Sequence, residues 1–164
     1  MKHKANKWVH DLAIYEPGRP IEEVARELGF EDTDEIVKIA SNENALGPSP
    51  KAVEAMKRSM AQMHLYPDGG CYFLRHRLAR KLGVKMEEIL VANGSNEVIE
   101  LLGHVFLAPG RNIVMAAGAF VVYKLVASSL QAGTIMVPMR DFTHDLDAML
   151  AAITPETQLV FISN

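Results

Sequence analysis

Apolar and polar positions follow two different patterns along the chain, and the change comes near residue 89. From there on, short apolar runs alternate with amphipathic segments, as is typical of parallel strands buried on both faces and the helices between them. We therefore expect an α/β fold with right-handed crossovers. The predicted strands are 89–92, 113–116, 134–138 and 158–163, and the predicted helices are 96–107, 120–131 and 145–153.

Before residue 89 the pattern is less regular. Residues 1–19 are mostly polar with a few apolar positions and are expected to form an arm. Helix start and stop signals, such as Pro at the first turn and Gly after the last, define three further helices. These are predicted at 21–28 between Pro20 and Gly29, from Pro50 to about 62 with Ser49 as N-cap, and at 72–82 before Gly83; a short strand is predicted at 36–40.

The last predicted strand contains Leu159–Ile162, and the sequence stops two residues later. A parallel strand is normally followed by a helix that covers the sheet, because an uncovered strand exposes apolar area and an open edge. The expectation is therefore that the chain is a fragment.

Composition narrows the function classes. The 164 residues are 49% hydrophobic and 23% charged with a net charge of −3, which indicates a globular protein and gives no reason to expect a nucleic-acid partner. No apolar run reaches the length of a membrane span, and the N-terminus lacks a signal-peptide core, so a cytoplasmic location is expected. The lone Cys71 excludes an internal disulfide, and the six histidines are scattered, so we expect no metal site.

The turn Asn93-Gly94-Ser95-Asn96 links a predicted strand to a predicted helix. The first N–H groups of a helix have no partner within the helix, and together with the helix dipole they favour an anion. The turn has no lysine and no GxGxxG pattern, so it predicts a site for a single phosphate rather than a nucleotide. The alternative is a plain turn and helix cap, and Glu97 favours it because a carboxylate in the first turn would repel an anion.

Five stretches, in order along the chain, together resemble the histidinol-phosphate aminotransferases, a family of fold type I aminotransferases that use pyridoxal 5′-phosphate (PLP). The resemblance covers residues 39–164 well and the preceding residues more loosely. The stretches are Ser41-Asn42-Glu43-Asn44-Ala45-Leu46-Gly47-Pro48-Ser49-Pro50, Tyr66-Pro67-Asp68 with Leu74-Arg75, Asn93-Gly94-Ser95-Asn96-Glu97, Ala119-Phe120-Val121-Val122-Tyr123, and Leu159-Val160-Phe161-Ile162-Ser163-Asn164.

The resemblance implies roles for particular residues. The backbone N–H groups at Gly94, Ser95 and Asn96 would hold the PLP phosphate, in agreement with the helix-terminus argument above. Phe120 would stack on the pyridine ring, although a core position at a helix start is the simpler interpretation of a phenylalanine there. Tyr66 would reach across a dimer interface to the partner subunit's cofactor phosphate; otherwise it is a loop anchor.

Asn42, Glu43 and Asn44 resemble the segment that borders the substrate entrance, and a hydrogen-bonded turn explains them equally well. Tyr123 is expected to pack rather than to take part in chemistry. Arg75 also matches a family position, but an arginine on a helix surface is usually solvated or paired.

The resemblance also implies what this stretch of sequence lacks. The lysine that forms the Schiff base with PLP, the aspartate that pairs with the pyridine nitrogen and the arginines that bind the substrate carboxylate all fall beyond residue 164 in the family pattern. Lys51, Lys81 and Lys124 stand on polar helix faces or at helix starts, so no catalytic residue is predicted within this chain.

The implied fold is the first part of the large-domain, mainly parallel sheet with flanking helices, plus an N-terminal arm. Residues 1–45 would form the arm and part of a small domain, and residues 46–164 the incomplete PLP-binding domain. The implied activity of the whole enzyme is transamination between histidinol phosphate and 2-oxoglutarate in histidine biosynthesis, by a homodimer. The alternatives are a non-catalytic phosphate-ligand-binding or interaction remnant, or part of an aromatic aminotransferase or threonine-phosphate decarboxylase.

Overall fold

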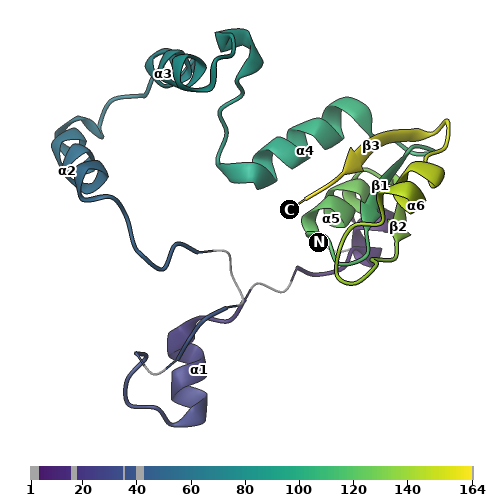
Figure 1. Ribbon diagram of the computed structural model, residues 1–164, viewed down its shortest axis with the longest axis horizontal. Coiled ribbons are helices and arrows are strands. Elements are labelled where there is room, and N and C mark those ends of the chain that lie inside the picture. Colours follow the sequence, from purple (N-terminus) through teal and green to yellow (C-terminus); the bar gives the residue numbers. More distant parts are fainter. Residues whose placement is uncertain (1–3, 16–17, 35, 40–42, 164) are drawn as a thin grey trace. The chain divides into compact units, whose positions relative to one another are not determined.

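The computed structural model describes residues 4–15, 18–34, 36–39 and 43–163. The chain divides into two compact units. The first, called the sheet unit, comprises Met1–Tyr15 and Arg77–Asn164, and the second, called the helical unit, comprises Glu16–His76. Figure 1 shows the course of the chain through both units.

The sheet unit contains three parallel strands in the order β2-β1-β3. They are β1 (Asn112–Ala116), β2 (Gly133–Val137) and β3 (Thr157–Phe161). At the centre, Val114 stands opposite Ile135 on one side and Val160 on the other. The α/β class and the parallel sheet predicted from the apolar runs are therefore confirmed.

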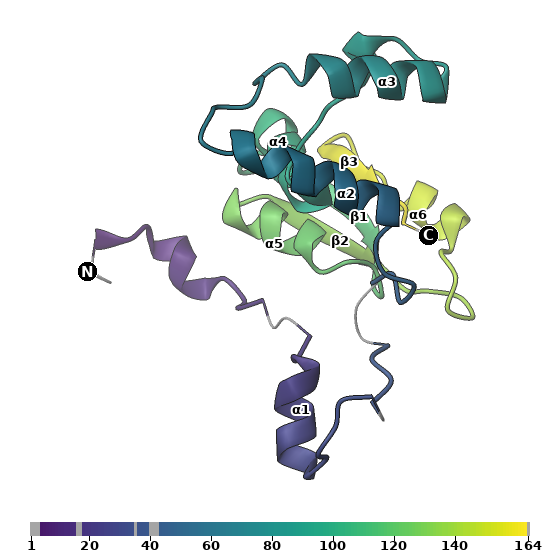
Figure 2. The ribbon, with the colours of Figure 1, turned by 90° about the vertical axis from the view of Figure 1, so that its left-hand side faces the viewer.

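Helices cover both faces of this sheet (Figures 1 and 2). On one face, Ile113 and Met115 pack with Ala127 of α5 (Val122–Ser129). On the other face, Val114 and Val137 pack with Met149 of α6 (Leu146–Ala151). Because successive side chains of a strand point to opposite faces, a strand covered on both faces needs apolar residues at successive positions, and all four residues of β1 after Asn112 are apolar and buried.

Helix α4 (Gly94–Phe106) packs against α5 through a glycine. A Cβ atom on Gly103 would lie 2.5 Å from Val126 Cγ1 and 2.9 Å from Leu130 Cδ1. Such distances are shorter than non-bonded carbon–carbon contacts, so a larger residue at position 103 would force the two helices or these side chains to shift. The second half of α4 thus lies against the second half of α5.

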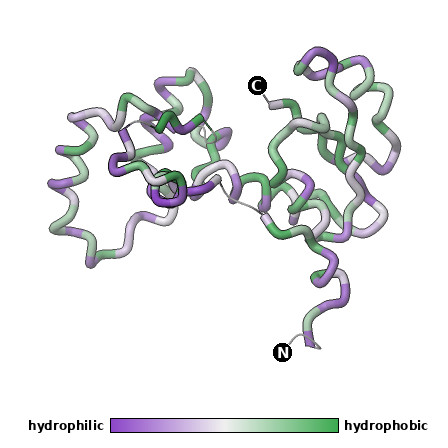
Figure 3. The backbone as a smooth tube through the Cα atoms, turned by 90° about the horizontal axis from the view of Figure 1, so that it is seen from below, coloured by the Kyte–Doolittle hydropathy of each residue, from purple (hydrophilic) through white to green (hydrophobic). Residues whose placement is uncertain are grey.

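The N-terminal arm is tied to the same unit. It forms a short 3-10 helix, η2 (Lys7–Asp11), and the indole Nε1 of Trp8 donates a hydrogen bond of 3.3 Å to the Ser129 carbonyl at the end of α5. In Figure 3 the tube of this arm is mostly hydrophilic, whereas the strands are hydrophobic.

The helical unit holds α1 (Ile21–Leu28), α2 (Pro50–Ser59) and η3 (Met60–Gln62), and α3 (Tyr72–Leu82) begins in it. The predicted bounds of α1 and α3 are confirmed. Both helices stop because the next residue is a glycine in the left-handed conformation, with φ of 75° at Gly29 and 71° at Gly83.

Two predicted strands are wrong. After η4 (Met86–Glu88), Ile89 has extended backbone angles, but residues 89–92 pair with no strand of the described chain, and Leu90 is 63% exposed. Residues 36–39 likewise form no strand, while residue 40 lies outside the described residues. Apolar character alone does not make a strand, since the ladder needs a hydrogen-bonding neighbour.

Some helix bounds also differ from the prediction. Helix α4 begins two residues before the predicted start, at Gly94, and α5 covers only Val122–Ser129 of the predicted 120–131. The helix ends there because Gln131 takes a positive φ of 59°.

No helix in the described part of the chain is long and apolar enough to cross a membrane.

Candidate functional site

The turn that begins α4 has an unusual backbone conformation. Gly94 has φ of +78°, a region that side chains with a Cβ rarely adopt, and its N–H donates to the Ala92 carbonyl at 2.9 Å. The preceding residue, Asn93, is the N-cap, but its side chain makes no capping hydrogen bond to the helix. Glycine is therefore required here to turn the chain sharply into the helix.

This turn leaves donors available. Within the described residues, the backbone N–H groups of Ser95 and Asn96 meet no hydrogen-bond acceptor, and both residues are exposed. They stand in the first turn of a 13-residue helix, where the macrodipole is positive. Two adjacent free N–H groups at such a position can bind the oxygens of one phosphate group.

Glu97 does not oppose this role in the structure. Its carboxylate oxygen Oε2 accepts hydrogen bonds from the backbone N–H of Asn93 at 2.5 Å and from Asn93 Nδ2 at 3.1 Å. The negative charge is thus bound to the residue before the helix. Residue type and spacing could not predict this arrangement, because a carboxylate in the first turn can equally approach the helix amides.

Phe120 follows the carboxyl end of β1 and precedes α5. Its side chain is 39% exposed, and its ring lies nearly perpendicular to that of Tyr123, with the centroids 5.8 Å apart. Tyr123 in turn stacks on Phe161 with the centroids 4.1 Å apart, as part of the core. The prediction that Tyr123 packs is confirmed, while Phe120 retains exposed ring surface for a ligand.

The candidate residues of the helical unit have different surroundings. Tyr66 is fully exposed. Asn44 closes a turn by itself, since its Nδ2 donates to the Gly47 carbonyl at 3.0 Å and its Oδ1 accepts from Leu46 N–H at 3.1 Å. Glu43 forms an ion pair of 3.1 Å with Lys38, and Asn42 lies outside the described residues. Arg75 donates to the Gly70 carbonyl at 3.4 Å.

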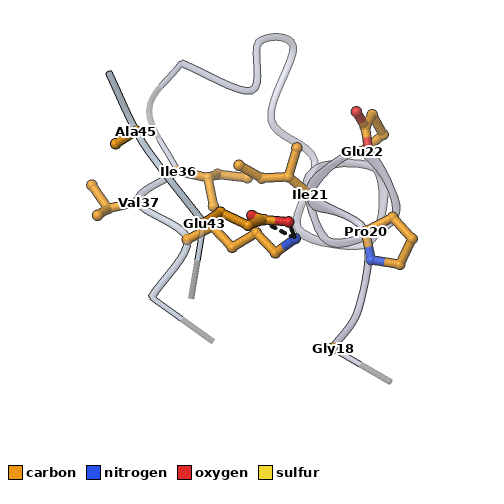
Figure 4. A pocket seen from close by; sticks show the side chains of 9 residues that line it. Gly18, Pro20, Ile21, Glu22, Ile36, Val37, Glu43 and Ala45 are labelled. Carbon is orange, nitrogen blue, oxygen red and sulfur yellow. Dashed lines mark hydrogen bonds and ion pairs between the residues drawn. The ribbon is translucent and has the colours of Figure 1, made fainter. Parts of the chain in front are cut away.

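Figure 4 shows a hollow of about 630 Å³ within the helical unit, between α1 and residues 36–38, 43 and 45. Its wall is apolar at Ile21 and Ile36, and the Lys38–Glu43 ion pair crosses it. An ion pair that already satisfies both charges offers neither a general base nor a nucleophile. The hollow is therefore a weaker candidate for a catalytic site than the start of α4.

The carboxylate of Asp68 illustrates how local hydrogen bonds shape this unit. It accepts from the backbone N–H of Tyr72 at 2.8 Å and of Gly70 at 2.9 Å, and these bonds to the charged form lower the pKa of Asp68 below its ordinary value. The bond to Tyr72 caps the start of α3.

Among the described residues, no group of three or more His, Cys, Asp or Glu side chains could hold a metal ion.

Comparison with known proteins gives a consistent result. No family model matches the sequence. The chain is 47% identical over 161 residues to the histidinol-phosphate aminotransferase of Moorella thermoacetica, and 50% identical over 161 residues to that of Akkermansia muciniphila. Each match covers 98% of this chain but only 41% and 44% of the respective relative, so the chain spans less than half of their length.

Solved structures extend the comparison to the fold. The crystal structure of histidinol-phosphate aminotransferase from Sinorhizobium meliloti in complex with pyridoxal-5′-phosphate matches with a TM-score of 0.77 at 23% identity, covering 93% of this chain and 40% of that one. An aspartate aminotransferase from Thermus thermophilus matches with a TM-score of 0.74 at 20% identity, covering 96% and 44%. The chain therefore has the fold of part of a fold type I aminotransferase, as predicted.

Proposed function

We propose that this chain, which is homologous over nearly its whole length to histidinol-phosphate aminotransferases, forms the part of a PLP-dependent aminotransferase that binds the cofactor's phosphate and covers its ring. The observation that carries the proposal is the pair of free N–H groups at Ser95 and Asn96 behind the left-handed Gly94. The position of Phe120 supports it, because its partly exposed ring follows the carboxyl end of β1 and immediately precedes α5, which packs against α4.

The residues present fit the cofactor. Gly94, Ser95 and Asn96 would hold the phosphate through backbone donors and the helix dipole, without a basic side chain. Phe120 would cover one face of the pyridine ring, and its apolar surface would exclude water there. PLP, when bound, supplies an electron sink for the bond changes at the substrate's amino carbon.

The proposed substrates are histidinol phosphate and the glutamate/2-oxoglutarate pair, which makes the activity a step of histidine biosynthesis. The support is sequence similarity to relatives that carry this name. An aromatic aminotransferase and a threonine-phosphate decarboxylase are the alternatives within the same fold. Free Cys71 is compatible with the cytoplasm, where we expect the enzyme to act.

We also propose a homodimer, in which Tyr66 contacts the cofactor phosphate bound by the partner subunit. Tyr66 is fully exposed, so its hydroxyl is accessible to a partner subunit. Asn42, Glu43 and Asn44 would border the substrate entrance. Asn44 would do so through its turn backbone, because its side chain is engaged in the turn itself.

The catalytic lysine and the arginines that bind the substrate carboxylate are assigned to the portion of the relatives that this chain does not match. We therefore expect no transamination from residues 1–164 alone. Supplying that portion, either in one polypeptide or as a separate chain mixed with this one, should produce both the visible absorbance of bound PLP and transaminase activity.

The decisive experiment compares Ser95→Pro with Ser95→Ala in the protein that combines this chain with the missing portion. Proline deletes one donor N–H yet is tolerated in the first turn of a helix, whereas alanine keeps the N–H and removes only the hydroxyl. Loss of a hydrogen bond to a charged group costs about 1.5–3 kcal/mol, so Ser95→Pro should weaken PLP binding by roughly 10- to 100-fold. Equal PLP affinity of both variants, with melting temperatures unchanged, would show that the phosphate binds elsewhere.

A further inference from the structure

His144 lies in the connection between β2 and α6. It forms a long-range hydrogen bond that no sequence motif predicts. Its Nε2 atom is 2.5 Å from the carbonyl oxygen of Ser163, 19 residues further along the chain. A carbonyl oxygen can only accept, so Nε2 must carry the hydrogen. The ring is therefore held in one tautomer, as a donor to the backbone just after β3.

The Ser163 carbonyl needs such a donor because the sheet does not reach it. The pairing of β3 with β1 ends at Phe161, opposite Met115. Ile162 and Ser163 continue past this point, and among the described residues His144 provides the one hydrogen bond to Ser163. A side chain thus takes the place of the ladder at Ser163.

The connection that carries His144 is itself braced. Arg140 and Thr143 exchange two backbone hydrogen bonds of 3.0 and 2.8 Å around a tight turn. Asp145 accepts from Ala148 N–H at the start of α6 and forms an ion pair of 2.6 Å with Arg140. His144 stands between these two fixed points, so its imidazole has little freedom to move away from Ser163.

The second ring nitrogen makes the arrangement more demanding. Nδ1 of His144 is buried and meets no hydrogen-bond partner in the described part of the chain. The carboxylate of the neighbouring Asp145 is already engaged with Arg140 and Ala148. A buried acceptor without a donor is unfavourable, and a leucine would fill similar volume without this penalty. The histidine is therefore better explained by its bond to Ser163 than by packing.

We propose that His144 is a positioning residue that fixes the direction in which the chain leaves β3 beside the cofactor site. In parallel α/β sheets, ligands bind at the carboxyl ends of the strands. Phe120 follows the carboxyl end of β1, and Ser163 follows the carboxyl end of its neighbour β3. The part of the inference that concerns the cofactor rests on the proposed function; the hydrogen bond that holds the strand exit does not.

The test uses the protein that combines this chain with the missing portion and compares His144→Gln with His144→Leu. Glutamine can place an amide N–H near the position of Nε2, whereas leucine fills the space without a donor. His104→Leu serves as a control, because His104 is an exposed histidine on α4. Hydrogen–deuterium exchange is measured for the peptide that contains residues 160–163, and PLP affinity is measured by titration of the cofactor-free protein.

Loss of one hydrogen bond should accelerate exchange in this peptide about fivefold in His144→Leu and weaken PLP by a similar factor, while His144→Gln and His104→Leu stay within about twofold. Unchanged exchange in His144→Leu, or equal exchange in the glutamine and leucine variants, would overturn the role of the donor. Faster exchange with unchanged PLP affinity would overturn the link to the site. If the unmodified protein does not bind PLP at all, the proposed function fails, and the exchange data still decide whether His144 holds the strand exit.

Discussion

The two units of this chain bury apolar surface to very different extents. In the sheet unit, β1 is enclosed on both faces, and Ile113 and Val114 are completely inaccessible to solvent. Among the described residues of the helical unit, Ala25 is the one buried hydrophobic residue. The sheet unit therefore contains a core of its own, whereas the helical unit has regular helices with almost no core.

Large apolar side chains in the helical unit stay exposed, including Leu46 at 96% and Phe73 at 82%. Local interactions hold its elements instead, such as the ion pairs of Arg19 with Glu23 and Glu27 along α1. Exposed pairs of this kind contribute little to stability. The helical unit thus has almost no core of its own, and we expect it to be stabilised by a surface outside the unit.

The largest expected effect tests this difference directly. Ile113→Ala should destabilise the 164-residue chain by about 2–5 kcal/mol, because it leaves a cavity between β1 and α5. Leu46→Ala should change the stability of the same chain by less than about 0.5 kcal/mol, since the side chain makes almost no contact there. Urea unfolding followed by circular dichroism measures both values.

The contrast sharpens when the missing portion is supplied. Leu46→Ala should then become destabilising, because the added portion would cover the exposed surface, whereas the effect of Ile113→Ala should stay the same. A Leu46→Ala variant that is equally neutral in both contexts would contradict the dependence of the helical unit on an external surface.

The next effect concerns the packing of helices within the sheet unit. Gly103→Ala should destabilise by about 1–3 kcal/mol, because the new methyl group collides with Val126 and Leu130. Ala108→Gly, at an exposed position after α4, serves as the control. Gly110→Ala is unsuitable as a control because Gly110 has a positive φ, where an alanine would be strained. If α4 moves to relieve the collision, PLP affinity should fall together with stability; a full loss of stability with unchanged affinity would separate the helix contact from the phosphate site.

Sequence patterns predicted the sheet unit better than the helical unit, and the reason is physical. A parallel strand covered on both faces has apolar residues at successive positions, so Ile113–Ala116 of β1 stand out as a continuous apolar run, and β2 and β3 each end in three apolar residues. The same criterion failed at 89–92 and 36–39, whose apolar residues pair with no strand among the described residues. The apolar residues of one segment do not show whether a second strand is present to pair with it.

The candidate site was predicted in part. The free N–H groups after Gly94 follow from the general geometry of helix starts, and the exposure of Phe120 agrees with its expected role. The position of the Glu97 carboxylate on Asn93 and the bond from His144 to Ser163 could not be predicted. Both depend on side-chain directions and on contacts between distant residues, which neither spacing nor residue type reveals.

A smaller effect distinguishes ligand surface from core surface within the sheet unit. Phe120→Ala should weaken PLP binding by about 1 kcal/mol through lost ring contact and should cost less stability than Tyr123→Ala. The reason is that Tyr123 stacks on Phe161 inside the core, while Phe120 has an exposed ring. Cofactor titration and thermal unfolding of both variants measure the difference. A larger stability loss for Phe120→Ala than for Tyr123→Ala would return Phe120 to a purely structural role.

The smallest effect is a pH dependence in the helical unit, where local bonds stand in for a core. Hydrogen bonds from Tyr72 and Gly70 lower the pKa of Asp68 in the folded chain below its value in the unfolded chain. Its contribution to stability is therefore complete above the unfolded pKa and is lost as the pH falls through the lower, folded pKa. The Tyr72 amide chemical shift, followed by NMR between about pH 5 and pH 2, should change with a midpoint below the ordinary aspartate value, and Asp68→Asn should abolish this transition. A midpoint at or above the ordinary value would mean that the hydrogen bonds from Tyr72 and Gly70 to Asp68 do not persist in solution. The start of α3 would then need contacts outside the helical unit to stay ordered.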